Sequence, residues 1–143
     1  MTPDDLLARA RRALTSARLL LSDGDKDGAC NRAYYAMFDA ARAALTKAAP
    51  DHVPAQSVKT HRGMISAFGH YLVKPGIVPA DLGRVLNQVE RIRLLADYTG
   101  EGIDPAKARW LVEQTAEFVS RMEETVNGDR DGPPSRDGPS STW

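Results

Sequence analysis

The sequence of residues 26–48 is KDGACNRAYYAMFDAARAALTKA, which has the pattern of a long helix. Its apolar side chains cover an unusually wide arc of the helical wheel: Ala33, Tyr34, Met37, Phe38, Ala40, Ala41, Ala44 and Leu45. A helix that is apolar over most of its circumference lies at the centre of a domain or at an interface. This segment therefore predicts a helix that is either central or part of an interface.

The same helix keeps one polar strip, which holds Arg32, Tyr35, Asp39 and Arg42 at helical spacing. Two interpretations of this strip remain open. It is either a face in contact with water, as most polar strips are, or one wall of a cleft whose other wall carries Arg93.

A second helix is predicted on the N-terminal side of this segment, at residues 3–22. Its start, Thr2-Pro3-Asp4-Asp5, combines a cap residue, a proline of the first turn and acidic side chains at the positive end of the helix dipole. One apolar stripe follows, formed by Leu7, Ala10, Leu14, Ala17 and Leu21. Residues 22–25 make so short a turn that the two helices are expected to pair as an antiparallel hairpin.

Three more helices are predicted on the C-terminal side. Residues 57–73 place these side chains in one apolar register: Val58, His61, Ile65, Phe68 and Leu72. A fourth helix starts near residues 79–81 and stops at 99–102, with one face formed by Leu82, Val85, Leu86, Val89, Ile92 and Ala96. A fifth helix runs from Asp104-Pro105 to about Val126.

Residues 1–126 are therefore expected to form one all-α domain, an up-and-down bundle of about five helices. Residues 127–143 are rich in Gly, Pro and Ser and contain almost nothing apolar. Such a segment does not bury enough surface to offset its ordering entropy, so we expect a disordered tail.

The 143 residues carry 19 basic and 19 acidic side chains, so any site for a polyanion must be a local cluster. A single cysteine, Cys30, excludes an intrachain disulfide. No apolar run approaches the ~20 residues of a membrane span, and the acidic N-terminus is no signal peptide, so we expect a cytoplasmic protein. Three histidines without metal-ligand spacing, and no cysteine pair, predict neither a metal site nor a cofactor.

The stretch Arg93-Leu94-Leu95-Ala96-Asp97-Tyr98 lies near the end of the fourth helix and holds the side chains best suited to chemistry. On the helical wheel Arg93 lies on the apolar stripe, Asp97 at its edge and Tyr98 well away from it. A guanidinium on an apolar stripe must be paired or line a cleft, because an unpaired buried charge is costly. Two alternatives follow: an ion pair with Asp97, or a site where Arg93 meets the phosphate of a nucleotide.

His61 occupies an apolar position of the third helix. Such a histidine usually packs in a core or an interface. Acid–base catalysis is the alternative, and it needs a partner that the sequence does not place.

Three stretches occur in order along the chain: Asn31-Arg32-Ala33-Tyr34-Tyr35-Ala36, then Lys59-Thr60-His61-Arg62-Gly63 with Phe68, then Arg93 to Tyr98. Together they resemble the HEPN superfamily, in particular its small stand-alone bacterial and archaeal branch, over about residues 5–126. The resemblance implies a dimerising helical bundle with a cleft near the dimer interface. It also implies frequent pairing with a small nucleotidyltransferase in toxin–antitoxin modules.

Some HEPN proteins are metal-independent RNases with an Arg, a His a few residues later and often a Tyr shortly after the His. In paired systems the partner can adenylylate that Tyr. This chain departs from that pattern, because the position five residues after Arg91 is Ala96 and that after Arg93 is Tyr98. Asp97 and Tyr98 stand where an RNase would have its His. A carboxylate there would repel phosphate and lacks the near-neutral pKa of a histidine.

Three hypotheses about function follow. The first is a HEPN component of a toxin–antitoxin module without RNase activity, which binds a nucleotide or its partner protein through the Arg93/Asp97/Tyr98 surface. The second is a metal-independent endoribonuclease toxin in which Arg93 acts with Tyr98 or His61. The third is a non-catalytic dimeric scaffold. The candidates for catalysis are thus Arg93, Asp97, Tyr98 and His61, and Tyr98 is also the candidate for modification.

Arg93, Arg32 and Tyr35 are the candidates for binding a nucleotide or RNA. We also expect a homodimer, because apolar side chains extend beyond a single stripe on two helices. They are Leu94 and Leu95 and the broad arc of residues 26–48.

Overall fold

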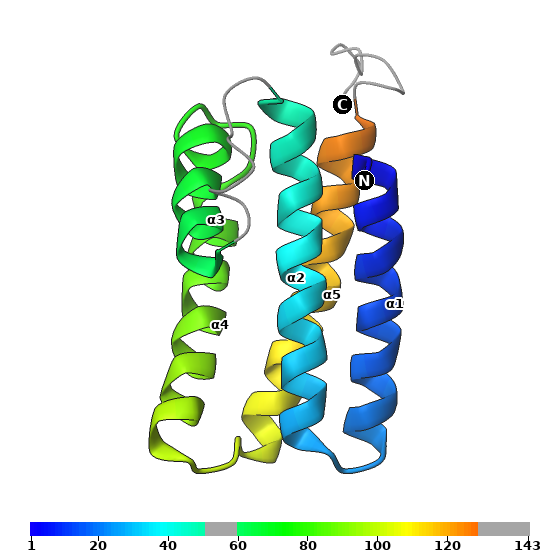
Figure 1. The fold of residues 1–143 in the computed structure, drawn as a ribbon, viewed down its shortest axis with the longest axis vertical. Helices are drawn as coiled ribbons and strands as arrows, with labels where there is room; N and C mark the ends of the chain where they lie inside the picture. The colour runs from blue at the N-terminus through cyan, green and yellow to red at the C-terminus, as the bar shows by residue number, and fades with distance from the viewer. Residues whose placement is uncertain (51–59, 129–143) are drawn as a thin grey trace, which may run out of the picture.

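The computed structural model describes residues 1–50 and 60–128, and its regular elements are all helices (Figure 1). They are α1 (Pro3–Ser22), α2 (Lys26–Ala48), α3 (His61–Phe68), the π-helical turn η2 (Gly69–Val73), α4 (Ala80–Thr99) and α5 (Pro105–Asn127). The described residues contain no strand. The predicted all-α fold of about five helices is therefore confirmed. None of the described helices is long and apolar enough to cross a membrane.

Helix α2 lies at the centre of the bundle, with α1 and α5 packed along one side and α3 and α4 on the other (Figure 1). These neighbours bury the apolar arc, and seven alanines of the helix have an exposed fraction of 0%: Ala29, Ala33, Ala36, Ala40, Ala41, Ala43 and Ala44. Methyl side chains let neighbouring helices approach closely, because the distance between helix axes depends on the side chains at the contact. The arc therefore belongs to the core of one chain and gives no support to a dimer.

The predicted bounds of α1 and α2 are confirmed. Thr2 caps α1 by accepting a hydrogen bond from the Asp5 backbone N–H at 3.1 Å, while its own N–H donates to the Asp5 carboxylate at 2.9 Å. Hydrogen bonds from the backbone N–H and the side chain of Thr2 to its carboxylate lower the pKa of Asp5, because they stabilise the charged form. Asp25 caps α2 in the same way, through the Gly28 N–H at 2.9 Å. Helices α1 and α2 thus both start at a side chain that satisfies a free backbone donor.

The third helix is shorter than the predicted residues 57–73. Thr60 is extended and accepts the Gly63 N–H at 3.0 Å, so it caps a helix that begins at His61. Val58 lies outside the described residues. From Gly69 onward the turn widens into η2, where the Lys74 N–H donates to the Gly69 carbonyl at 2.9 Å, one residue further than in an α-helix.

Helix α4 buries only three residues, Leu82, Leu86 and Val89, and all of them lie in its first half. It ends at Gly100, whose φ of 72° is the left-handed conformation that glycine adopts without strain. Residues 100–104 lead into α5, which Asp104 caps by accepting the Lys107 N–H at 2.9 Å. Asn127 still belongs to α5, one residue beyond the predicted end. The disordered tail was predicted for residues 127–143, of which 129–143 lie outside the described residues.

The polar strip of α2 is only partly in contact with water. Asp39 is 5% exposed, and its carboxylate accepts two hydrogen bonds of 2.9 Å from Arg9 of α1. Arg42 is also half-buried, whereas Tyr35 is 39% exposed. The interpretation of this strip as a solvated face is therefore wrong for Asp39, because the ion pair with Arg9 compensates the burial of its charge.

Candidate functional site

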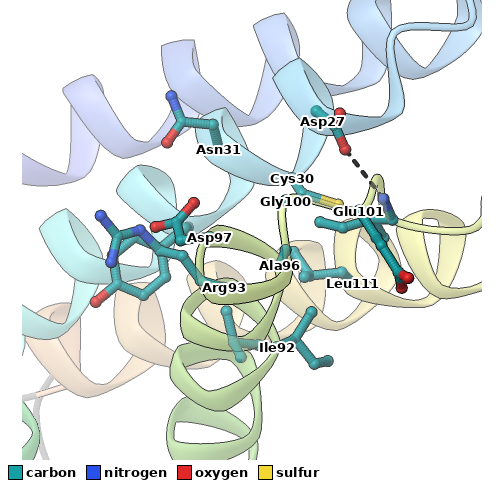
Figure 2. A pocket seen from close by; sticks show the side chains of 13 residues that line it. Asp27, Cys30, Asn31, Ile92, Arg93, Ala96, Asp97, Gly100, Glu101 and Leu111 are labelled. Carbon is teal, nitrogen blue, oxygen red and sulfur yellow. Dashed lines mark hydrogen bonds between the residues drawn. The ribbon is translucent and has the colours of Figure 1, made fainter.

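A pocket of about 380 Å³ lies between α2, α4, the segment after α4 and the first half of α5 (Figure 2). Its walls contain Asp27, Cys30, Asn31 and Tyr34 of α2, Val89, Ile92, Arg93, Ala96 and Asp97 of α4, Gly100, Glu101 and Ile103 of the connecting segment, and Leu111 of α5. Ligand pockets in proteins start at about 300 Å³, so this volume is large enough for a small molecule. The structure thus places Arg93 and Asp97 in one concave site.

Arg93 lies over the ring of Tyr34, with 5.0 Å between its guanidinium carbon and the ring centre. The ion pairs among the described residues do not include Arg93 with Asp97, so the predicted pair of these two side chains is wrong. The face of an aromatic ring attracts a cation, and the half-buried guanidinium keeps contact with water. A carboxylate partner is therefore not required for its charge.

Tyr34 is the side chain on which the other site residues meet. It is 2% exposed, and its hydroxyl donates a hydrogen bond of 2.7 Å to Oε1 of Glu90 on α4. Burial, followed by this bond to Glu90, raises the pKa of Tyr34 above its ordinary value. The hydroxyl therefore stays protonated and acts as a donor that ties α2 to α4.

His61, the first residue of α3, packs edge-on against two rings of α2. Its ring centre lies 4.7 Å from that of Tyr34 and 5.0 Å from that of Phe38. Burial lowers the pKa of His61, and the positive charge of Arg93 lowers it further. His61 and Arg93 thus contact the same Tyr34 ring from two different helices, which the sequence did not predict.

The two predicted binding residues of α2 lie outside this pocket. The guanidinium carbon of Arg32 lies 5.7 Å from the centre of the Tyr35 ring, and that ring lies 6.5 Å from His61. The Tyr35 ring also lies 6.1 Å from that of Tyr34, so Tyr35 borders the site through Tyr34 and His61, and Arg32 contacts Tyr35 behind them. The residues of α2 that line the pocket are Asp27, Cys30, Asn31 and Tyr34 instead.

The stretch from Arg93 to Tyr98 divides between two faces of α4. Arg93 and Asp97 line the pocket, whereas Tyr98 is 90% exposed and does not line it. Leu94 and Leu95 are 46% and 60% exposed. We call Leu94, Leu95 and Tyr98 the outer face of α4. The outward direction of Tyr98 confirms the helical-wheel prediction.

Cys30 also lines the pocket, but its thiol is not activated. Burial, with a smaller effect of the nearby Asp27 charge, raises the pKa of Cys30 to about 11. Because the thiolate is the nucleophilic form, this cysteine has the properties of a packing residue.

Two site residues, Tyr34 and Glu90, were not among the sequence candidates. Tyr34 was assigned to the core on its apolar register, and that assignment agrees with its burial. Its contacts with Glu90 and Arg93 join positions 56 or more residues apart. No helical spacing signals such a contact, although the polar tip of a buried tyrosine usually needs a hydrogen-bond partner.

Comparison with known proteins identifies the family. The HEPN domain family matches residues 3–125. A UPF0332 protein of Gloeobacter violaceus is 38% identical over 123 residues, which cover 83% of this chain and 93% of that protein. A protein of Methanocaldococcus jannaschii named "Putative toxin" is 30% identical over 121 residues, covering 85% of this chain and 86% of that protein. The fold, the order of the three motifs and these matches together place the chain in the HEPN domain family.

Proposed function

We propose that this protein is the HEPN component of a toxin–antitoxin module and that it acts by binding a partner protein through the outer face of α4. The observation that carries the proposal is the 90% exposure of Tyr98 next to two exposed leucines. Large apolar and aromatic side chains that gather on a surface are typical of protein interfaces. The match to a relative named as a toxin, and the pairing that the family resemblance implies, favour a nucleotidyltransferase-type partner.

RNA cleavage by the family's usual arrangement is not part of this proposal. Asp97, which follows Arg93 by one helical turn, is a carboxylate where a proton-transferring histidine would be needed. Its charge in the pocket repels the phosphate that Arg93 would otherwise bind. We therefore expect no binding of ATP at the pocket by calorimetry, which tests the nucleotide-binding alternative directly.

Co-purification with the product of the adjacent gene tests the proposal. We expect a stable complex with the wild-type chain and its loss when Leu94→Ser and Tyr98→Ala are combined. Ile77→Ser is the matched control, because Ile77 is 49% exposed but lies before α4 and not on its outer face. A complex that survives the double substitution would refute the proposed surface.

Modification of Tyr98 is a separate part of the proposal. Its exposed hydroxyl is accessible to a transferase, unlike that of Tyr34. Incubation with the partner and ATP is expected to add the mass of an adenylyl group to the wild-type protein but not to Tyr98→Phe. An unchanged mass of the wild-type protein rejects the modification while leaving the binding proposal intact.

We also propose that the outer face of α4 forms a homodimer before the partner binds, because exposed apolar side chains that gather on one face favour self-association. Light scattering on the chain alone is expected to give twice the monomer mass. Leu95→Ser is expected to shift the mass towards the monomer. A monomeric wild-type protein refutes the dimer.

A second candidate function is a metal-independent endoribonuclease, and one contact favours it. His61 and Arg93 pack on the same Tyr34 ring, with His61 at 4.7 Å and Arg93 at 5.0 Å from its centre. A neutral histidine next to a guanidinium is a suitable pair for proton transfer and phosphate binding. Tyr98, which points away from Arg93, is a poor alternative to His61.

Expression in cells, with growth and RNA integrity as readouts, decides between the two candidates. Activity that is lost in both His61→Gln and Arg93→Gln, and kept in Tyr98→Phe, supports the nuclease. Normal growth with intact RNA in the wild type rejects it. Loss of activity in Tyr98→Phe alone points back to Tyr98 and rejects the pair of His61 and Arg93.

A further inference from the structure

The pocket between α2 and α4 has an excess of negative charge. Three carboxylates line it, those of Asp27, Asp97 and Glu101, against the single guanidinium of Arg93. That guanidinium lies against the Tyr34 ring, 5.0 Å from its centre. A concave site with this balance concentrates cations and repels phosphate groups, because the low dielectric of the walls focuses the field.

The carboxylates lie towards two ends of the pocket. Figure 2 shows Asp97 next to Arg93 at one end and Asp27 and Glu101 towards the other. The rest of the lining is mostly apolar, with Cys30, Ile92, Ala96 and Leu111 among its side chains and Asn31 as a polar one. A ligand that matches this lining carries a positive charge at each end and an apolar body.

The carboxylates are also available to a ligand. Asp97 and the side chain of Glu101 form no hydrogen bond or ion pair with any residue that the structure describes. Asp27 uses one oxygen, Oδ1, to accept the Ile103 N–H at 3.1 Å. That bond fixes the Asp27 side chain at the pocket wall, and its second oxygen has no such partner.

From this lining we propose that the pocket binds a short aliphatic diamine. One ammonium group pairs with Asp97, the other with Asp27 and Glu101, and the methylene chain lies against Ile92 and Leu111. Each ammonium then meets a carboxylate acceptor, and the methylenes leave water for an apolar surface. The proposal concerns the inner side of α4 and does not rest on the partner-binding role of its outer face.

A hydrated divalent cation fits this lining less well. The described residues hold no group of three or more His, Cys, Asp or Glu side chains placed to ligate one metal ion. Oxygen ligands for Mg²⁺ must converge at about 2.1 Å from one point, whereas these carboxylates lie at separate ends. Mg²⁺ is therefore a useful negative control for a general attraction between cations and acidic side chains.

The test is a titration of the full chain, monitored by amide NMR shifts, with three four-carbon compounds that differ in charge and with MgCl₂. Putrescine carries two ammonium groups on a chain of four carbons, and butylamine carries one. Butanediol has the carbon chain but no charge, and Mg²⁺ has the charge but no carbon chain. We expect saturable shifts around the pocket with putrescine, about fivefold weaker binding of butylamine and no saturable binding of the other two. Equal affinity for butylamine, or matching shifts with Mg²⁺, overturns the proposal.

Three conservative variants localise the binding. Asp97→Asn and Glu101→Gln keep the shape of the pocket while removing one charge each, and each is expected to weaken putrescine binding about fivefold. Glu113→Gln is the matched control, since Glu113 is exposed on α5 and does not line the pocket. Unchanged binding in both pocket variants refutes the site. Tyr98→Ala is expected to leave putrescine binding intact, so failure of this proposal is distinguishable from failure of partner binding.

Discussion

The guanidinium carbon of Arg93 lies 5.0 Å from the centre of the Tyr34 ring, so a cation of α4 is held by an aromatic side chain of α2. The hydroxyl of the same tyrosine donates to Glu90, one turn before Arg93 on α4. Tyr34 thus contacts α4 through both its ring and its hydroxyl, while His61 of α3 packs on its edge. Three helices, α2, α3 and α4, thus meet at this one residue.

Tyr34→Phe is expected to lower the free energy of unfolding by about 1–2 kcal/mol. The ring and its contacts with Arg93 and His61 remain, but Glu90 loses a hydrogen bond of 2.7 Å that the hydroxyl donates. Urea denaturation measures the change. Tyr35→Phe is the matched control, because Tyr35 is 39% exposed, and its effect should stay within about 0.5 kcal/mol. Equal effects of the two substitutions would show that the bond to Glu90 contributes nothing.

His61 makes stability depend on pH. Its pKa is lowered from the ordinary value of 6.5 by burial and then by Arg93, so the folded chain binds this proton less tightly than the unfolded chain. The unfolded state therefore takes up more protons below pH 6.5, and stability falls as the pH drops through the folded pKa. Well above pH 6.5 the His61 side chain is neutral in both states, so it no longer makes stability depend on pH.

Denaturation of the wild type and of His61→Gln at several pH values isolates this effect, since all other groups are shared. The stability difference between the two proteins is expected to shrink as the pH falls from about 7.5 to about 5. NMR titration of His61 should give a pKa that moves up towards 6.5 in Arg93→Gln, because a positive charge is removed. A pKa unaffected by that substitution contradicts the electrostatic role of Arg93.

The ion pair of Arg9 with Asp39 is expected to stabilise the fold more than the ion pairs on the surface. The Asp39 side chain is 8% exposed, so Arg9→Met leaves a buried carboxylate without its partner. We expect a loss of about 2 kcal/mol, less than for a fully buried pair because Arg9 is 41% exposed. Arg121→Met, whose glutamate partners are 64% and 74% exposed, should cost less than about 1 kcal/mol. Thermal denaturation that ranks the two variants in the reverse order would exclude this explanation.

Two glycines are expected to respond oppositely to alanine. A Cβ at Gly100 meets no atom within 4 Å, but φ of +72° makes alanine cost about 1 kcal/mol. A Cβ at Gly69 also meets nothing, and the backbone there has φ of −61°, so Gly69→Ala should stabilise by about 0.5–1 kcal/mol. Melting temperatures should therefore move down for Gly100→Ala and up for Gly69→Ala. A decrease for both would place the effect in something other than backbone conformation.

The fold was predictable wherever local signals determine it. Thr2 and Asp104 mark the starts of α1 and α5, and residues 22–25 mark the turn between α1 and α2, because capping and turn chemistry act within a few residues. The start of α3 was not predictable in this way. Its apolar register continues back to Val58, so periodicity alone extends the helix beyond the point where Thr60 caps it.

The candidate site was predictable only in part, for a related reason. A helical wheel placed Arg93 inward and Tyr98 outward, and both directions are confirmed. It offered Asp97 as the partner of Arg93 because the wheel contains only residues of the same helix. The side chain that contacts Arg93 is Tyr34, which is 59 residues away in sequence and had been assigned to the core on its own helix. Contacts of this kind arise from packing between helices, which residue spacing does not encode.

The burial pattern of α4 has a consequence for how its two halves exchange their amide hydrogens. The three buried residues, Leu82, Leu86 and Val89, all precede the segment that carries Arg93, Asp97 and Tyr98. Local unfolding of that later segment exposes little apolar surface, so its amides should exchange with solvent well before those of α2. A partner or ligand that contacts the last turns of α4 would slow this exchange, and the protection would report the contact amide by amide.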